Sequence, residues 1–141
     1  MNMKNNIKVN GILYHNKKCS KSREALKYLN ESNIDFSTVD YLMNPPDIPK
    51  LLSLSHKLKI QVKELIRVNE SIFSDLKYKI KDDKTELEWA EILFDNPILI
   101  QRPIFETKTT AVIGRPLENI VKLLESISDK GDSYNRSILN D

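Results

Sequence analysis

The residues with the clearest capacity for chemistry lie together in the stretch YHNKKCSKSREAL, at positions 14–26. This stretch holds the only cysteine of the chain, Cys19, where an apolar run stops and a helical pattern starts. At the start of a helix a thiol faces unpaired backbone N–H groups and the positive end of the helix dipole, and both favour the thiolate. Three lysines and Arg23 add positive charge nearby. The pattern therefore predicts a reactive thiolate, and the same N–H groups can hold an oxyanion beside it.

The polar residues of this stretch also have plainer interpretations. A free cysteine is often a small buried residue, but the lysine and serine next to Cys19 argue against burial. The hydroxyl groups of Ser20 and Ser22 can donate hydrogen bonds to an anion, and the planar fork of Arg23 matches oxyanion geometry. On its own, His15 fits a polar residue at the end of a strand.

Three further arginines stand out by their context. Arg67 lies in ELIRVNE, Arg102 precedes a proline in ILIQRPIF, and Arg115 precedes another in AVIGRP. An arginine inside an apolar run is costly unless it is paired or directed at a ligand. For each arginine alone, a surface salt bridge is the default interpretation, and spacing cannot tell whether the three converge.

The composition of the 141-residue chain narrows the possible classes. With 22 Lys and Arg against 20 Asp and Glu, the net charge of +2 gives no general attraction to nucleic acid or to a membrane. A single cysteine cannot form an internal disulfide, and no apolar run reaches the length of a membrane span. Two histidines make no plausible metal cluster with one cysteine, and three glycines leave little material for a nucleotide-binding loop. We expect a single domain in the reducing cytoplasm, with no bound cofactor or metal.

The first half of the chain predicts a strand-helix-strand unit. The expected elements are an apolar strand ending near His15, a helix over 20–33, a strand over 34–42 and a helix over 48–59. Asp47 can cap the last of these helices after the break at Asn44. A crossover of this length implies that the two strands are parallel.

The second half is first helical and then mixed. Helical spacing continues from residue 62 to about residue 95, with KDDK at 81–84 as a solvated connection. The expected elements after it are short strands over 98–100, 104–105 and 109–113, and a helix from Pro116 to about Ile127. The outline is an α/β fold in which a helical insert, at about 60–96, separates an N-terminal β-α-β-α part from a C-terminal β-β-α part. One domain over 1–130 and a polar tail over 131–141 are expected.

Five short motifs, in order along the chain, resemble those of one known family. They are HNKKCSKSR, YLMNPP, LIRVNE, NPILIQRPI and IGRP. Together they resemble the glutaredoxin- and glutathione-linked arsenate reductases, the ArsC family, from Ile12 to Leu124. The CSKSR loop differs from the CGTSR-like loop of the better-known reductases and is more typical of the ArsC-like branch. The resemblance implies a thioredoxin-like fold, a central mixed β-sheet flanked by helices.

The resemblance also implies a role for each candidate residue. Cys19 would be the nucleophile that forms a covalent thiol–arsenic intermediate, and His15 would help to keep it as thiolate. The three catalytic arginines that surround the oxyanion would be Arg67, Arg102 and Arg115. The substrate-binding residues of the loop would be Asn16, Ser22 and Arg23. Pro103 falls where thioredoxin-like folds place a cis-proline opposite the active-site loop.

The implied reaction is the reduction of an oxyanion, arsenate to arsenite, in arsenic detoxification. A chain with one thiol has no internal resolving cysteine. Glutathione would therefore act as co-substrate on the arsenic–sulfur adduct, and glutaredoxin would close the cycle by thiol–disulfide exchange. The expected partners are arsenate or a similar oxyanion, glutathione and glutaredoxin, with the protein itself a monomer.

Two other functions stay open from the sequence. Spx regulators share the fold and contact RNA polymerase, and those with a redox switch usually use Cys-x-x-Cys near the N-terminus. Here Ser22 takes the second position, so that switch cannot form within this chain. The other alternative is a glutathione-linked thiol oxidoreductase without arsenic chemistry, in which the arginines would bind glutathione carboxylates.

Overall fold

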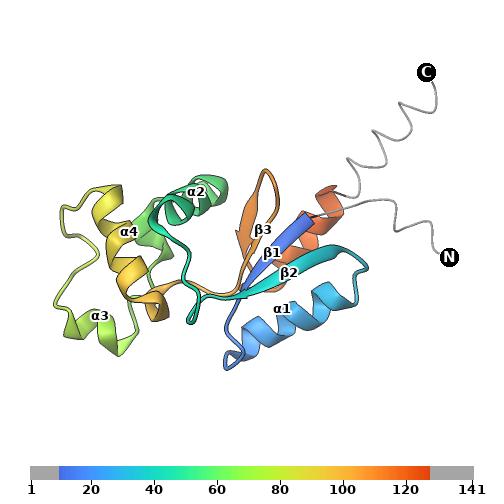
Figure 1. The fold of residues 1–141 in the computed structure, drawn as a ribbon, viewed down its shortest axis with the longest axis horizontal. Helices are drawn as coiled ribbons and strands as arrows, with labels where there is room; N and C mark the ends of the chain where they lie inside the picture. Colours follow the sequence, from blue (N-terminus) through green and yellow to red (C-terminus); the bar gives the residue numbers. More distant parts are fainter. Residues whose placement is uncertain (1–9, 128–141) are drawn as a thin grey trace, which may run out of the picture.

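A four-stranded mixed sheet organises the fold, and the computed structural model describes residues 10–127 of the chain (Figure 1). Its strands are β1 (Asn10–His15), β2 (Asp35–Asp40), β3 (Ile104–Glu106) and β4 (Ala111–Ile113). The strand order is β2-β1-β3-β4. β1 runs parallel to β2 and antiparallel to β3, which in turn pairs antiparallel with β4. The α/β class predicted from the sequence is confirmed.

One face of the sheet is covered by α1 (Ser20–Asn30), the crossover between the two parallel strands, and by the helix over 118–127. Alternate residues of a strand point to opposite faces, so Leu13 and Phe105 meet on this side and pack against both helices. Gly11 allows the close fit, because a Cβ at this position would overlap the Phe105 ring. The packing of α1 on this face sets where its first residue lies relative to the end of β1.

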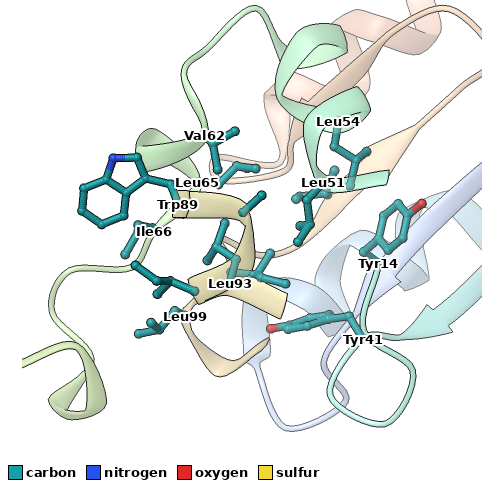
Figure 2. Close-up of a cluster of buried hydrophobic side chains, with 14 of the residues drawn as sticks. Tyr14, Tyr41, Leu51, Leu54, Val62, Leu65, Ile66, Trp89, Leu93 and Leu99 are labelled. Carbon is teal, nitrogen blue, oxygen red and sulfur yellow. The ribbon is translucent and has the colours of Figure 1, made fainter. Parts of the chain in front are cut away.

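The other face carries the larger core, which α2 (Ile48–Leu58) and the insert enclose (Figure 2). The insert consists of η2 (Val62–Leu65), α3 (Ser71–Asp75), α4 (Glu86–Asp95) and η3 (Pro97–Leu99). Trp89 and Leu93 of α4 pack in one cluster with Leu51 of α2 and with Tyr14 of the sheet. This shared core holds the insert against the sheet.

Two helix starts are fixed by side-chain caps. The Asp47 carboxylate accepts a hydrogen bond from the Lys50 N–H at 2.9 Å, so its predicted role at the start of α2 is confirmed. Thr85 and Glu88 form a reciprocal capping box at the start of α4, with bonds of 3.0 Å and 2.8 Å. Such caps contribute about 1 kcal/mol each to helix stability.

The strand predicted over 98–100 is wrong. Pro97 begins the short 3-10 helix η3, and only Ile100 makes a β contact, an isolated antiparallel bridge to Ile66. The apolar, β-branched run looks like a strand locally, but its partner segment offers one residue for pairing. The bridge nevertheless ties the insert to the segment that leads into β3.

Other predicted boundaries move by a few residues. α1 ends at Asn30 rather than at residue 33, and a turn over 31–33 follows, in which Asn33 adopts a left-handed backbone with φ of 56°. The last helix begins at residue 118 rather than at Pro116. The apolar positions before Asn10 and the predicted tail over 131–141 lie outside the described residues.

Within residues 10–127, no helix combines the length and the apolar character needed to span a membrane. In the same part of the chain, no group of three or more His, Cys, Asp or Glu residues is arranged to hold a metal ion.

Candidate active site

Cys19 is the N-cap residue of α1, at the helix start where the sequence predicts it. Its N–H donates to the Asn16 carbonyl at 2.9 Å, and its own carbonyl accepts from the Arg23 N–H at 3.0 Å. These two bonds close the turn between β1 and α1. The thiol is partly exposed at the positive end of the helix.

The surroundings of Cys19 favour its thiolate. Burial opposes ionisation and is the largest single influence, but the N–H groups of Ser22 and Lys21 and the guanidinium of Arg102 together outweigh it. The pKa of the thiol is therefore held below its ordinary value of 9.0. The side chain makes no formed capping hydrogen bond in the free protein. These donors stabilise the thiolate by hydrogen bonding, and the charge of Arg102 adds to the effect.

A buried hydrogen-bond network orders the loop before α1. Ser22 is completely buried, and its Oγ lies 2.6 Å from His15 Nδ1 and accepts a hydrogen bond from the Asn16 N–H at 3.0 Å. Burial lowers the pKa of His15 from 6.5, and Arg23 acts in the same direction while Asp40 opposes it. This shift favours the neutral form of the His15 imidazole. Its ring nitrogen Nδ1 contacts the serine whose N–H favours the Cys19 thiolate.

Two of the three predicted arginines lie together around one carboxylate. Glu70 Oε1 is 2.9 Å from Arg67 Nη1 and 3.6 Å from Arg102 Nη2. The Arg67 contact is close, but its orientation does not make a hydrogen bond, and Nη1 has no other partner. Arg102 is 12% exposed, and its Nε and Nη1 atoms are buried without any acceptor. Buried donors are normally paired, so these atoms are candidates to donate hydrogen bonds to a ligand.

Main-chain pairing brings these arginines together from distant parts of the chain. The Arg67 N–H donates to the Leu99 carbonyl at 2.7 Å, and the Gln101 N–H donates to the Leu65 carbonyl at 2.8 Å. Arg67 directly follows one of the two bridge residues, and Arg102 comes two residues after the other. The guanidinium of Arg67 therefore comes from the insert, and that of Arg102 comes from the segment before β3.

Pro103 connects this segment to the loop after β4. The peptide bond between Arg102 and Pro103 is cis, and the Pro103 carbonyl accepts a hydrogen bond from the Gly114 N–H at 2.8 Å. A Cβ at Gly114 would lie 2.7 Å from Ile120 Cδ1 and 3.1 Å from Pro103 Cγ, so a larger residue there would have to displace these side chains. Arg115 follows directly, and its side chain is exposed.

The remaining predicted residues are less involved in side-chain contacts at the site. The guanidinium of Arg23 donates to the Lys17 carbonyl at 2.9 Å on the exposed side of the loop. The three lysines of the loop are also exposed. The residues that the structure gathers around the thiol are His15, Asn16, Ser22 and Arg102, with Arg67 linked through Glu70.

Two members of the site were not predicted as such. Glu70 lies three residues after Arg67, the spacing of neighbours on one helical turn, and this signal alone suggests only a local ion pair. Tyr41 directly follows β2 in the YLMNPP motif, and it is completely buried. Its hydroxyl lies within the electrostatic influence of Arg102, Asn16 and Cys19. Neither residue could be assigned without knowing which distant residue it faces.

Known proteins resemble this chain in sequence and in fold. The ArsC family model matches residues 14–123. An arsenate reductase of Neisseria meningitidis serogroup A is 36% identical over 116 residues, which cover 79% of this chain and 96% of that protein. YfgD of Escherichia coli K12, an uncharacterised protein, is 35% identical over 114 residues, covering 79% and 94%. The solved structure of an arsenate reductase from Vibrio cholerae matches with a TM-score of 0.75 at 30% identity, covering 81% of this chain and 97% of that one.

These similarities bear on both the fold and the family. The four-stranded mixed sheet with flanking helices matches that of solved ArsC structures, so the thioredoxin-like fold expected from the sequence is confirmed. The family model matches most of the chain, and the relatives are matched over nearly their full length. The chain therefore belongs to the ArsC family.

Proposed function

We propose that this protein reduces arsenate to arsenite through a covalent bond between Cys19 and arsenic, with glutathione as co-substrate and glutaredoxin as its partner. One observation carries most of the weight: Arg102 presents two buried N–H groups without an acceptor beside a thiol whose pKa is lowered. The similarity to proteins named arsenate reductase supports the choice of anion. The cytoplasm, where glutathione is abundant, is the proposed compartment, and a monomer is the proposed state.

Anion binding is the first step of the proposed reaction. Arsenate is a tetrahedral anion whose oxygens can accept hydrogen bonds from the buried N–H groups of Arg102 and from the first amides of α1. Arg67 adds a second guanidinium, joined to the first through Glu70. Arg115, exposed after the Gly114 turn, would complete the positive surroundings from the solvent side.

The chemical steps follow from the thiolate. The Cys19 sulfur attacks arsenic and a hydroxide or water leaves, so an S–As bond replaces an O–As bond. Glutathione supplies the second thiol, and the two thiols lose two electrons in forming a mixed disulfide while arsenic(V) becomes arsenic(III) and departs as arsenite. Glutaredoxin then removes glutathione from Cys19 by thiol–disulfide exchange. The positive groups offset the charge that develops on the oxygens during the attack.

Turnover of arsenate in the presence of glutathione and glutaredoxin tests the proposal. The wild-type protein should produce arsenite, and Cys19→Ser should abolish it, because serine lacks the ionised sulfur but fits the same place. Arsenite formation that survives the substitution unchanged would rule out the covalent route.

A second measurement separates arsenate chemistry from a thiol oxidoreductase that acts only on glutathione adducts. Iodoacetamide alkylates the thiolate, so arsenate bound over Cys19 should slow alkylation in a saturable way. Protection by glutathione disulfide but not by arsenate would favour the alternative, in which the arginines hold glutathione carboxylates.

A further inference from the structure

Within residues 10–127, four buried side-chain atoms have no hydrogen-bond partner, and all of them can donate. They are Tyr41 Oη, Arg67 Nη1, Arg102 Nε and Arg102 Nη1. Three of them belong to the arginines already placed around the anion. The fourth is a phenol that the proposed reaction has not used. Buried donors without a hydrogen bond are rare, so each of these atoms is a candidate to donate to a ligand.

The Tyr41 ring is part of the core, but its hydroxyl is not needed there. The residue is 0% exposed and packs with the cluster that joins the sheet to the insert (Figure 2). Its hydroxyl points away from that of Tyr14, the other labelled tyrosine (Figure 2). Tyr14 donates to the Glu106 carboxylate at 2.7 Å and is therefore satisfied. A phenylalanine would fill the place of the Tyr41 ring equally well.

The groups that act on the pKa of Tyr41 belong to the thiol site. Burial raises the pKa of Tyr41 to about 12, Arg102 and Asn16 act to lower it, and the charge of Cys19 adds to the rise. Such effects require that these groups lie close to the phenol. The hydroxyl therefore remains protonated at every physiological pH and is available as a donor.

We propose that the Tyr41 hydroxyl donates a hydrogen bond to an oxygen of the oxyanion held between Cys19 and Arg102, and is a further substrate-binding residue of this site. The inference rests on the proposed function, and it adds a neutral, directional donor to the charged ones. A tetrahedral oxyanion has acceptor oxygens in several directions. Arg102, the first amides of α1 and Tyr41 would each take a different oxygen. An uncharged donor buried in the core also fixes an orientation that a mobile cation at the surface cannot fix.

The test is arsenate protection of Cys19 against iodoacetamide, with Tyr41→Phe compared with the wild type. Removing a hydrogen bond to an anion should weaken half-maximal protection by about tenfold or more. The melting temperature of the free Tyr41→Phe protein should not fall, because the hydroxyl has no partner to lose. Tyr14→Phe is the matched control: it removes a satisfied hydroxyl elsewhere in the same core, so it should lower the melting temperature and leave the protection constant unchanged.

A pH profile of alkylation without arsenate checks where the hydroxyl acts. The profile of Tyr41→Phe should match that of the wild type, since the phenol is inferred to contact the anion and not the sulfur. A shifted profile, or the same protection constant in Tyr41→Phe and the wild type, would overturn the inference and leave the proposed function intact. If arsenate does not protect the wild-type thiol at all, the proposed function and this inference fail together.

Discussion

Arg102 offers the sharpest separation between function and stability, and Arg102→Gln is the change that exploits it. The side chain has two buried N–H groups without acceptors and one loose contact, 3.6 Å from Glu70. In the free protein it therefore contributes little, and its removal should change the free energy of unfolding by less than about 1 kcal/mol. This is unusual for a nearly buried charged residue, whose loss normally has a large effect.

The effect on anion binding should be far larger. A hydrogen bond to a charged partner contributes about 1.5–3 kcal/mol, and Arg102 offers two N–H groups to the anion. Taking the lower figure for each gives about 3 kcal/mol, which corresponds to an affinity lowered by roughly 100-fold or more. The pKa of Cys19 should rise as well, because burial already opposes ionisation and one of the groups that outweigh it is lost.

The assay is the alkylation rate of Cys19 at increasing arsenate concentration, normalised to the rate of each variant without arsenate. Normalisation removes the effect of the changed thiol pKa. Urea unfolding of the same preparations gives the stability. Arg102→Lys, which keeps the charge but not the planar fork, should retain an intermediate affinity. Unaltered protection in Arg102→Gln, or a loss of several kcal/mol of stability, would refute this account of the site.

Three other predictions concern the thiol and the frame that holds it. The alkylation rate of Cys19 should rise with pH through a midpoint below 9.0, since nearby N–H groups and a guanidinium outweigh the opposing effect of burial; a midpoint at or above 9.0 contradicts this. Glu106→Gln should lower the free energy of unfolding at pH 7 by about 3 kcal/mol, because Lys50 and Lys57 both lose their buried, negatively charged partner. Hydrogen bonds, against burial, hold the pKa of Glu106 below 4.5, so in urea unfolding the deficit should shrink as the pH falls below that value. Gly11→Ala should cost about 1–3 kcal/mol of unfolding free energy, because the new methyl overlaps the buried Phe105 ring; an unchanged urea midpoint would show that the ring can move.

The half of the site that surrounds the thiol could be predicted because its signals are local. A helical pattern that begins after an apolar run places Cys19 at a helix start whatever the rest of the chain does, and the structure has it there. The Asp47 cap followed from the same kind of reasoning. The strand expected over 98–100 failed for the opposite reason. Whether that run pairs along its length or at one residue depends on Ile66, more than 30 positions away in the chain.

The arginines of the site could be listed from the sequence, but their positions relative to one another could not be predicted. Arg67 and Glu70 are near neighbours in the chain, so their ion pair is a local matter. That Arg102 shares the same carboxylate, and that Tyr41 lies beside it, depends on the core that packs the insert against the sheet. The motif resemblance listed the three arginines as candidates, but it carried no information on which of their atoms lack hydrogen-bond partners.

The Glu70 carboxylate stabilises the close placement of Arg67 and Arg102. Two guanidinium groups brought together by the bridge between the insert and the segment before β3 repel each other, and a carboxylate between them offsets that repulsion. A single carboxylate oxygen cannot satisfy all the donors, and three buried guanidinium nitrogens make no hydrogen bond, although one of them, Arg67 Nη1, is in ion-pair contact with Glu70. The fold itself therefore assembles the arginines, and under the proposed function an oxyanion would gain hydrogen bonds without first having to order the groups that donate them.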